Sequence, residues 1–245
     1  MSQMPWNNED VRKQIIQINE EGGGGLIVHQ AEPHVACCLL VDTSSSMRGE
    51  KLRRLNAALA EFKQQVCEDP LSARRVDVCV IEFNDEPSVV TPFCPIREFE
   101  APVLTAKRCT GMGKGIRFAL EAVHEQVHQY HTLGVECYQP FVVMLTDGAP
   151  TDDISQIPAM IRECEQAGRY GRLRFHAIGV GDEDQVNYQV LNQLCHRVVK
   201  LQENDFSSLF RWISQSMQII SHSQAGVGTP PIQPLSKNMV LPWND

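Results

Sequence analysis

Short apolar runs alternate with longer amphipathic segments through most of the chain. Residues 34–41 and 141–146 are almost continuously apolar, which is typical of strands buried on both faces of a sheet. Between such runs, segments such as 50–68 carry apolar residues at helical spacing. The pattern predicts strands at 34–41, 76–83, 87–91, 141–146, 173–180 and 197–201, and helices at 50–68, 113–130, 153–167, 184–195 and 205–221.

This alternation predicts the fold class. Strands separated by helices form right-handed crossovers, which give a mainly parallel sheet covered by helices on both faces. The run at 87–91 follows a turn at Asn84-Asp85 and predicts one short antiparallel edge strand. We therefore expect a three-layer α/β fold over residues 34–221. In such sheets, ligands bind beyond the carboxyl ends of the strands.

Two flanking segments lie outside the alternation. Residues 1–33 contain a short predicted helix at 8–19 and then four consecutive glycines, which suggest a flexible linker. Residues 222–245 are rich in proline and read as a mobile tail. The expected organisation is an N-terminal extension (1–33), one domain (34–221) and a C-terminal tail (222–245).

Side chains with oxygen atoms gather where the predicted strands end. Asp42, Ser44 and Ser46 form a D-x-S-x-S run directly after the first strand. Thr110 precedes a predicted helix, and Asp147 follows the strand at 141–146. The fold would bring all three segments to one edge of the sheet. Because hard divalent cations prefer oxygen ligands, we predict that these five residues hold Mg²⁺, or Mn²⁺ or Ca²⁺.

The donor set also indicates what such an ion would do. If the two carboxylates act mainly through water or through hydrogen bonds to the serines, a divalent ion bound by three neutral hydroxyls keeps net positive character. One open coordination position would then attract an Asp or Glu of a protein partner. The surrounding sequence supplies no evident acid or base, so we expect a binding protein and not an enzyme.

The same motifs resemble the metal-ion-dependent adhesion site of von Willebrand factor type A (VWA) domains, over about residues 34–221. The run L-T-D-G-A-P-T-D at 145–152 is similar to small bacterial VWA proteins linked to tellurium resistance and stress response. That resemblance implies an adaptor in a signalling complex, with a protein kinase and a phosphatase as partners. The family usually has glycine where this chain has Ser45. The three ligand positions around Ser45 are unaffected.

An H-E-x-x-H run at residues 124–128 supports the main alternative, a metal-dependent hydrolase. In zinc peptidases two such histidines bind zinc and the glutamate activates water. Helical spacing places His124 and His128 beside the apolar stripe of their helix, and Glu125 nearly opposite it. A solvent-exposed flank of the helix therefore explains these residues without zinc chemistry. His131 is too close for the longer peptidase motif. Water activated by an ion at the five-residue site is a second form of this alternative.

Composition and charge narrow the function classes further. The net charge of −8 argues against a general nucleic-acid or anionic-membrane binder, which would need a basic surface. No apolar run approaches the ~20 residues of a membrane span. The nine cysteines include no C-x-x-C pair, their number is odd, and the chain starts without a signal peptide. A reducing cytoplasm is the expected location.

Overall fold

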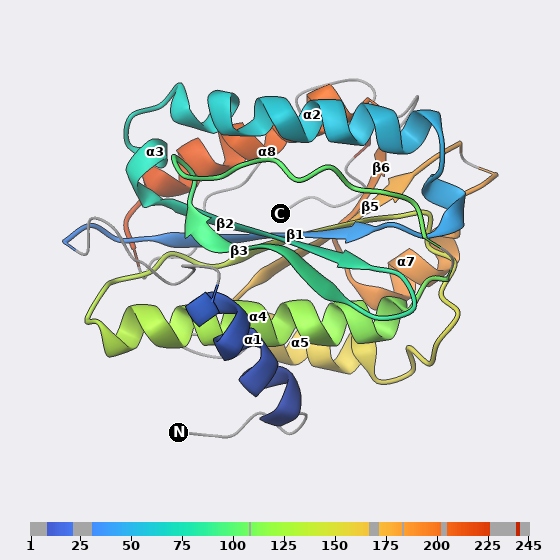
Figure 1. The fold of residues 1–245 in the computed structure, drawn as a ribbon, viewed down its shortest axis with the longest axis horizontal. Helices are drawn as coiled ribbons and strands as arrows, with labels where there is room; N and C mark the ends of the chain where they lie inside the picture. Colours follow the sequence, from blue (N-terminus) through green and yellow to red (C-terminus); the bar gives the residue numbers. More distant parts are fainter. Residues whose placement is uncertain are drawn as a thin grey trace.

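A seven-stranded sheet lies between two layers of helices in the computed structural model (Figure 1). The structure describes residues 9–21, 31–107, 109–166, 172–182, 184–201, 205–225 and 239–240. The strands are β1 (Val35–Asp42), β2 (Val76–Phe83), β3 (Ser88–Pro95), β4 (Phe141–Thr146), β5 (Arg174–Val180), β6 (Val198–Leu201) and β7 (Met239–Val240). The helices are α1 (Glu9–Glu21), α2 (Glu50–Cys67), α3 (Ser72–Arg75), α4 (Met112–Thr132), α5 (Ile157–Gln166), α7 (Tyr188–Leu194) and α8 (Phe206–Ser221), with a 3₁₀ turn at Ser45–Met47.

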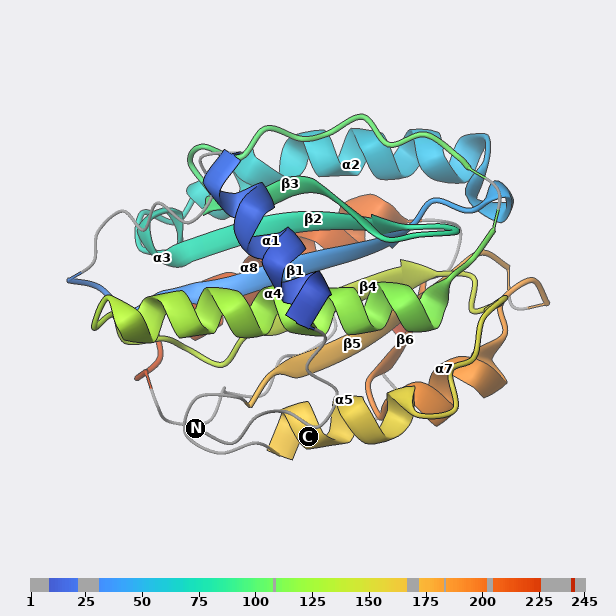
Figure 2. The ribbon, with the colours of Figure 1, turned by 60° about the horizontal axis from the view of Figure 1, so that its bottom comes forward.

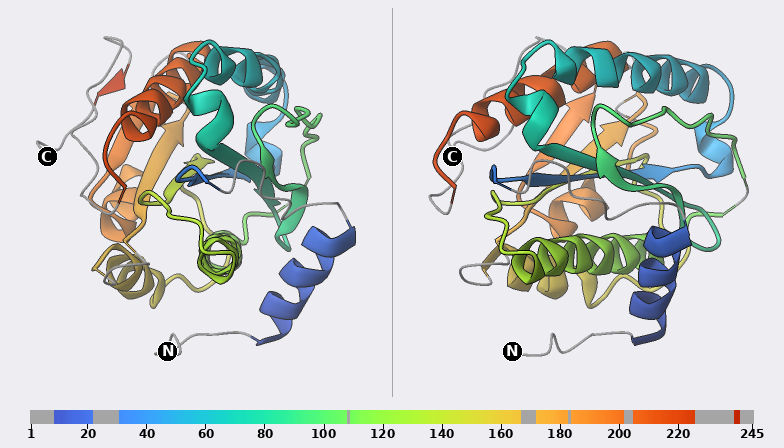
Figure 3. Two further views of the ribbon diagram at one scale, coloured as in Figure 1. Left: turned by 90° about the vertical axis from the view of Figure 1, so that its left-hand side faces the viewer. Right: turned by 60° about the vertical axis from the view of Figure 1, so that its left-hand side comes forward.

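The apolar runs form strands because both of their faces are buried. In β1, Cys37 and Leu39 belong to the core beneath α2 and α8, whereas Cys38 and Leu40 belong to the core beneath α4 and α5. Figure 3 shows these two helix layers on opposite sides of the sheet. Each strand residue therefore packs against one layer or the other, as continuous apolar runs require.

The strand order is β3-β2-β1-β4-β5-β6-β7, and β2, β1, β4, β5 and β6 run parallel. Asp42 is level with Phe83 of β2, and Val41 is level with Leu145 of β4. The carboxyl ends of β1, β2 and β4 therefore meet at one edge. The predicted three-layer α/β fold is confirmed, with antiparallel β3 at one edge of the sheet.

Both edges of the sheet differ in detail from the prediction. β3 continues to Pro95, beyond the predicted end at 91, because proline is tolerated on an edge strand whose outer side needs no donor. At the other edge, Met239–Val240 pairs antiparallel with Lys200 and Leu201. This pair lies inside the predicted mobile tail. The rest of that tail from residue 226 and the glycine linker at 22–25 lie outside the described residues.

Two helices begin later than predicted. α5 begins at Ile157 rather than 153, because the Asp153 side chain accepts a hydrogen bond from Ser155 N (2.9 Å) and forms a turn before the helix. α7 begins at Tyr188 rather than 184, with Asn187 as its cap. The predicted Asp start of the last helix is confirmed, since Asp205 Oδ1 accepts from Ser208 N (3.1 Å).

The N-terminal helix α1 crosses the outer side of α4 and reaches β3 (Figure 2). Its Ile15 is 2% exposed and joins the core beneath α4 and α5. The sequence predicted a helix here at 8–19. It did not predict the surface that the helix covers. Within the described residues, none of the helices combines the length and the apolar character needed to span a membrane.

A buried polar cluster fixes the opposite, amino edge of the sheet. Asp77 Oδ2 accepts hydrogen bonds from the Tyr130 hydroxyl (2.6 Å) and from His34 Nδ1 (2.9 Å). All three residues are almost completely buried. Burial and the Asp77 charge raise the pKa of Tyr130 well above its usual value, so its hydroxyl remains a donor. The cluster joins β2, α4 and the start of β1 at the end away from the candidate site.

Removing one donor from this cluster is expected to destabilise the domain. Tyr130→Phe keeps the ring but takes a hydrogen bond from a buried carboxylate, which costs about 1–2 kcal/mol. Urea unfolding of the variant and the wild type measures the difference. An unchanged free energy of unfolding would show that the cluster does not stabilise the fold.

Candidate metal centre

The centre of the candidate site is Asp42, the last residue of β1. Its Oδ1 accepts a hydrogen bond from Ser44 N (2.8 Å), and its Oδ2 accepts one from the Thr146 hydroxyl (2.7 Å). Ser44 Oγ lies 2.9 Å from Ser46 Oγ, because the 3₁₀ turn at Ser45–Met47 brings alternate side chains together. The D-x-S-x-S run thus forms the compact oxygen cluster that the sequence predicted.

Asp147 enters the same site from the end of β4. Its negative charge contributes to raising the pKa of Asp42, so the two carboxylates lie within electrostatic reach of each other. Its Oδ1 accepts from Ala149 N at 3.3 Å. Gly148 follows with a φ of 77°, and a Cβ there would meet the Asn187 carbonyl oxygen at 3.0 Å. Glycine is therefore required in the turn that presents Asp147.

Thr110 lies in a loop that hydrogen bonds to the segment after Asp147. Its carbonyl accepts from Thr151 N (2.9 Å), and its own N–H donates to the Thr151 hydroxyl (3.3 Å). The next residue, Gly111, packs so closely that a Cβ would lie 2.7 Å from the Asn84 carbonyl oxygen. Hydrogen bonds therefore connect Asp42, Ser44 and Ser46, and the charge of Asp147 acts on Asp42. Thr110 is connected to this group through the hydrogen bonds of its loop to Thr151.

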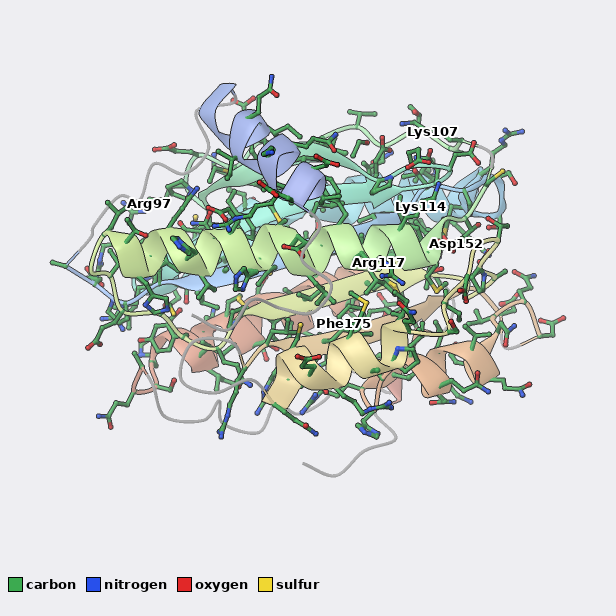
Figure 4. All side chains as sticks on the ribbon, turned by 90° about the horizontal axis from the view of Figure 1, so that it is seen from below. Arg97, Lys107, Lys114, Arg117, Asp152 and Phe175 are labelled. Carbon is green, nitrogen blue, oxygen red and sulfur yellow. The ribbon has the colours of Figure 1, made fainter. Side chains whose placement is uncertain are left out.

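Asp152 ties this loop to the Asp147 loop. Its two carboxylate oxygens accept from Gly113 N (3.1 Å) and Lys114 N (2.9 Å), so it caps α4 directly after Thr110. Asp152 directly precedes the helix predicted at 153–167, a position typical of its cap, but it caps α4 and not α5. Figure 4 shows Asp152 and Lys114 at the same end of α4. Long-range caps of this kind have no local sequence signature, because donor and acceptor are far apart in the chain.

Contacts of Lys107 hold the other side of the Thr110 loop. Lys107 N donates to the Thr43 carbonyl oxygen (2.6 Å), and its ammonium group pairs with Glu82 at the end of β2. Glu82 also accepts from the hydroxyls of Thr43 (3.2 Å) and Ser88 (3.0 Å). The loops that carry Asp42, Thr110 and Asp147 are thus cross-linked to one another and to β2.

The capping role of Asp152 leads to a paired prediction. Asp152→Ala removes both acceptors from α4 and is expected to destabilise the domain by about 1 kcal/mol. It is also expected to weaken Mn²⁺ binding, because the loop after Asp147 no longer positions Thr110. Asp153→Ala is the matched control, since the described hydrogen bond of that carboxylate, from Ser155 N, lies within its own turn. Equal Mn²⁺ affinities in the two variants, measured by calorimetric titration, would contradict the coupling.

Burial shapes the electrostatics of the site. Burial raises the pKa of Asp42 to about 6, although hydrogen bonds from Ser44 and Thr146 oppose the shift, and the Asp147 charge adds to it. Ser44 is 1% exposed, Asp147 4% and Thr110 6%. Two buried carboxylates, one of them bonded to the Thr146 hydroxyl, fit a small divalent cation, whose charge would offset their mutual repulsion.

The residues of the H-E-x-x-H run face different surroundings. Glu125 is buried and its Oε2 accepts from Arg12 Nε (2.8 Å), whereas the sequence reading placed it on the exposed side of the helix. The correction follows from α1, which covers that side of α4. His124 is exposed as expected, and His128 Nδ1 lies 3.2 Å from the Thr132 hydroxyl. Among the residues that the structure describes, no group of three or more His, Cys, Asp or Glu side chains is placed to hold a metal ion.

Comparison with known proteins identifies the domain type. The family model of the von Willebrand factor type A domain matches residues 38–209, which is most of the chain. No curated protein matches the sequence significantly. The solved structures that match do so at low sequence identity, so they are evidence for the fold alone.

Several solved structures share this fold at low sequence identity. The PilB minor pilin from Streptococcus sanguinis is 12% identical, with a TM-score of 0.55, over 76% of this chain and 62% of that one. The pilus adhesin SpaC from Lactobacillus rhamnosus GG is 15% identical, with a TM-score of 0.54, over 76% and 30% of the chains. A von Willebrand factor type A protein from Catenulispora acidiphila is 15% identical, with a TM-score of 0.51, over 76% and 43%. In all three, the match spans less than two thirds of the solved chain.

Proposed function

Because the chain belongs to the von Willebrand factor type A family, we propose that it is a protein-binding module that grips an acidic residue of its partner through a divalent cation. VWA domains are commonly protein-binding modules and often hold such a cation at this edge of the sheet. The observation that carries the proposal is the cluster of Asp42, Ser44, Ser46 and Asp147 at the carboxyl ends of β1 and β4.

The residues present would hold the ion with more hydroxyl than carboxylate oxygen. Asp42 already accepts two hydrogen bonds, from Ser44 N and the Thr146 hydroxyl, which reduces the negative charge that it can offer. An ion with such ligands keeps positive charge and favours a further carboxylate. We expect Asp42, Ser44, Ser46, Thr110 and Asp147 to bind and orient Mg²⁺, Mn²⁺ or Ca²⁺, and a partner's Asp or Glu to complete the shell.

The proposed biological setting rests on the sequence resemblance. The L-T-D-G-A-P-T-D run at 145–152 is similar to tellurium-resistance and stress-associated VWA proteins. We therefore propose an adaptor in a cytoplasmic stress-response complex, with a protein kinase and a phosphatase as candidate partners. The role proposed for the bound ion is to grip a partner and not to activate water.

A capture experiment tests this function. The full chain, immobilised in Mg²⁺ or in EDTA, is exposed to a cell extract from its source, and the bound proteins are identified by mass spectrometry. We expect a partner that is retained by the wild type only in Mg²⁺. Asp147→Ala is expected to lose this partner. Asp182→Ala, which removes an exposed carboxylate after β5, is expected to retain it. Retention in EDTA, or by Asp147→Ala, would refute the proposal.

A further inference from the structure

A long segment between β3 and α4 carries Thr110 to the candidate metal site. β3 ends at Pro95, at the amino edge of the sheet, and α4 begins at Met112, at the carboxyl edge. The chain between them therefore runs the length of the sheet, beside α2 (Figure 1 and Figure 2). Its described residues, 96–107 and 109–111, include no helix or strand, and we call this segment the strap. Connections of this length without regular structure are uncommon in compact domains and are usually functional.

The first part of the strap is fixed to the core and to α2. Phe99 and Leu104 are almost fully buried in the core beneath α2 and α8. The side chain of Asn56, on α2, makes two hydrogen bonds to the backbone of Leu104. Its Oδ1 accepts from Leu104 N (3.0 Å), and its Nδ2 donates to the Leu104 carbonyl oxygen (3.0 Å). Because both bonds come from one planar amide, they fix the direction of the strap as well as its position.

The second part of the strap is fixed to the D-x-S-x-S run. Lys107 N donates to the Thr43 carbonyl oxygen (2.6 Å), and the Lys107 ammonium group pairs with Glu82. Glu82 is 7% exposed and also accepts from the Thr43 hydroxyl (3.2 Å). Thr43 stands between the candidate ligands Asp42 and Ser44. The contacts of Lys107 therefore set the strap against the loop that carries these two ligands.

We propose that these contacts of the strap set the affinity of the candidate metal site. Asn56 and Lys107 are then positioning residues, which act on the ion through Thr110, three residues beyond Lys107 in the strap. The inference rests on the proposed function, because it requires that an ion binds at this edge. Groups that orient metal ligands from outside the coordination shell typically change metal affinity by about 10–100-fold when they are mutated.

Titration of the full chain with Mn²⁺, followed by electron paramagnetic resonance of the free ion, tests the proposal. Asn56→Leu removes both hydrogen bonds to the strap and is expected to weaken Mn²⁺ binding about tenfold. Lys107→Met should have a similar effect because Glu82 loses its charged partner, and Lys107→Arg should restore most of the affinity. Gln64→Leu, at an exposed position of α2, is the matched control and should bind as the wild type does. Tyr130→Phe, which removes a buried hydrogen bond at the other edge of the sheet, should also keep the wild-type affinity.

Hydrogen exchange in EDTA gives a second readout that needs no metal. The amides of Leu104 and Lys107 donate hydrogen bonds that fix the strap. Asn56→Leu is expected to speed their exchange about tenfold or more, and Gln64→Leu should leave it unchanged. Circular dichroism shows that each variant is folded at the temperature of the titration.

The outcomes separate this proposal from the one on which it rests. If the wild type binds no Mn²⁺, the proposed function fails, and this inference fails with it. If the wild type binds and both Asn56→Leu and Lys107→Met bind equally tightly, only the role of the strap is overturned. An equal loss of affinity in Tyr130→Phe would also overturn it, because the effect would then follow from a general loss of stability.

Discussion

Asp147→Ala is expected to abolish the thermal stabilisation that Mg²⁺ or Mn²⁺ gives to the wild-type protein. An ion that binds only the folded state stabilises it by about 2.7 kcal/mol at a hundred times its dissociation constant. For a domain of this size, that free energy corresponds to a rise of about 5–10 °C in the midpoint of unfolding. Asp147 supplies one of the two carboxylates, so its loss should remove this rise.

The variant should otherwise remain folded. The described hydrogen bond of the Asp147 side chain is a 3.3 Å contact with Ala149 N, whose loss costs little. Asp182→Ala is the matched control, because Asp182 is an exposed carboxylate after the neighbouring strand β5. Differential scanning calorimetry with and without the ion gives the comparison. A full response in Asp147→Ala, or none in the wild type at millimolar Mn²⁺, would contradict the proposed site.

Asp42→Asn is expected to stabilise the metal-free protein at neutral pH while it removes metal binding. Burial raises the pKa of Asp42 from 3.8 to about 6 in the folded state. The folded protein therefore binds this proton more tightly than the unfolded chain does. Its contribution to stability is fully present below pH 3.8 and is lost as the pH rises through about 6. Above pH 6 the ionised carboxylate then costs up to about 3 kcal/mol.

The neutral amide avoids this cost but disturbs one hydrogen bond. The Thr146 hydroxyl donates to Asp42 Oδ2 and accepts from Gly148 N, so an amide nitrogen at the Oδ2 position cannot be accommodated without loss. We expect a net gain of about 1–2 kcal/mol at pH 7.5. Urea unfolding in EDTA at pH 7.5 and pH 4 measures it. The gain should vanish towards pH 4, and a destabilised variant at pH 7.5 would contradict the account.

A second buried aspartate provides the contrast for this experiment. Asp77 accepts from Tyr130 and His34 at the amino edge of the sheet. An amide there would replace a charged acceptor that both donors need, so Asp77→Asn is expected to destabilise the protein at both pH values. The opposite signs of the two Asp→Asn changes separate an electrostatic cost at the candidate site from a general response to neutralising a buried carboxylate.

The sequence predicted the fold, and the edge of the sheet at which the candidate residues lie, because both follow from the order of strands and helices. The unbroken apolar run before Asp42 identified a buried parallel strand, and the positions of such strands fix which loops meet at the carboxyl edge. Asp42, Ser44 and Ser46 are close in sequence, so their proximity needed only a tight turn. The contact between the loops of Thr110 and Asp147 depends on tertiary structure. It forms because the chain crosses over after β1 and β2 and places β4 beside β1.

What the sequence could not predict depends on tertiary contacts between distant segments. Asp152 has the sequence context of a cap for α5, and only the packing of two loops makes it the cap of α4. Glu125 has the periodicity of an exposed residue, and only the docking of α1 buries it. Periodicity reports which face of a helix is polar. It does not report that a second helix with a complementary charge covers that face.

The central claim is that one divalent cation binds at the carboxyl edge of the sheet through Asp42 and its neighbours. Titration of the EDTA-treated, desalted full chain with Mn²⁺, followed by electron paramagnetic resonance of the free ion, tests it most directly. We predict one bound ion per chain in the wild type and in Asp182→Ala, and none at the same concentrations in Asp42→Asn or Asp147→Ala. Equal binding by all four proteins, or no binding by the wild type, would contradict the account.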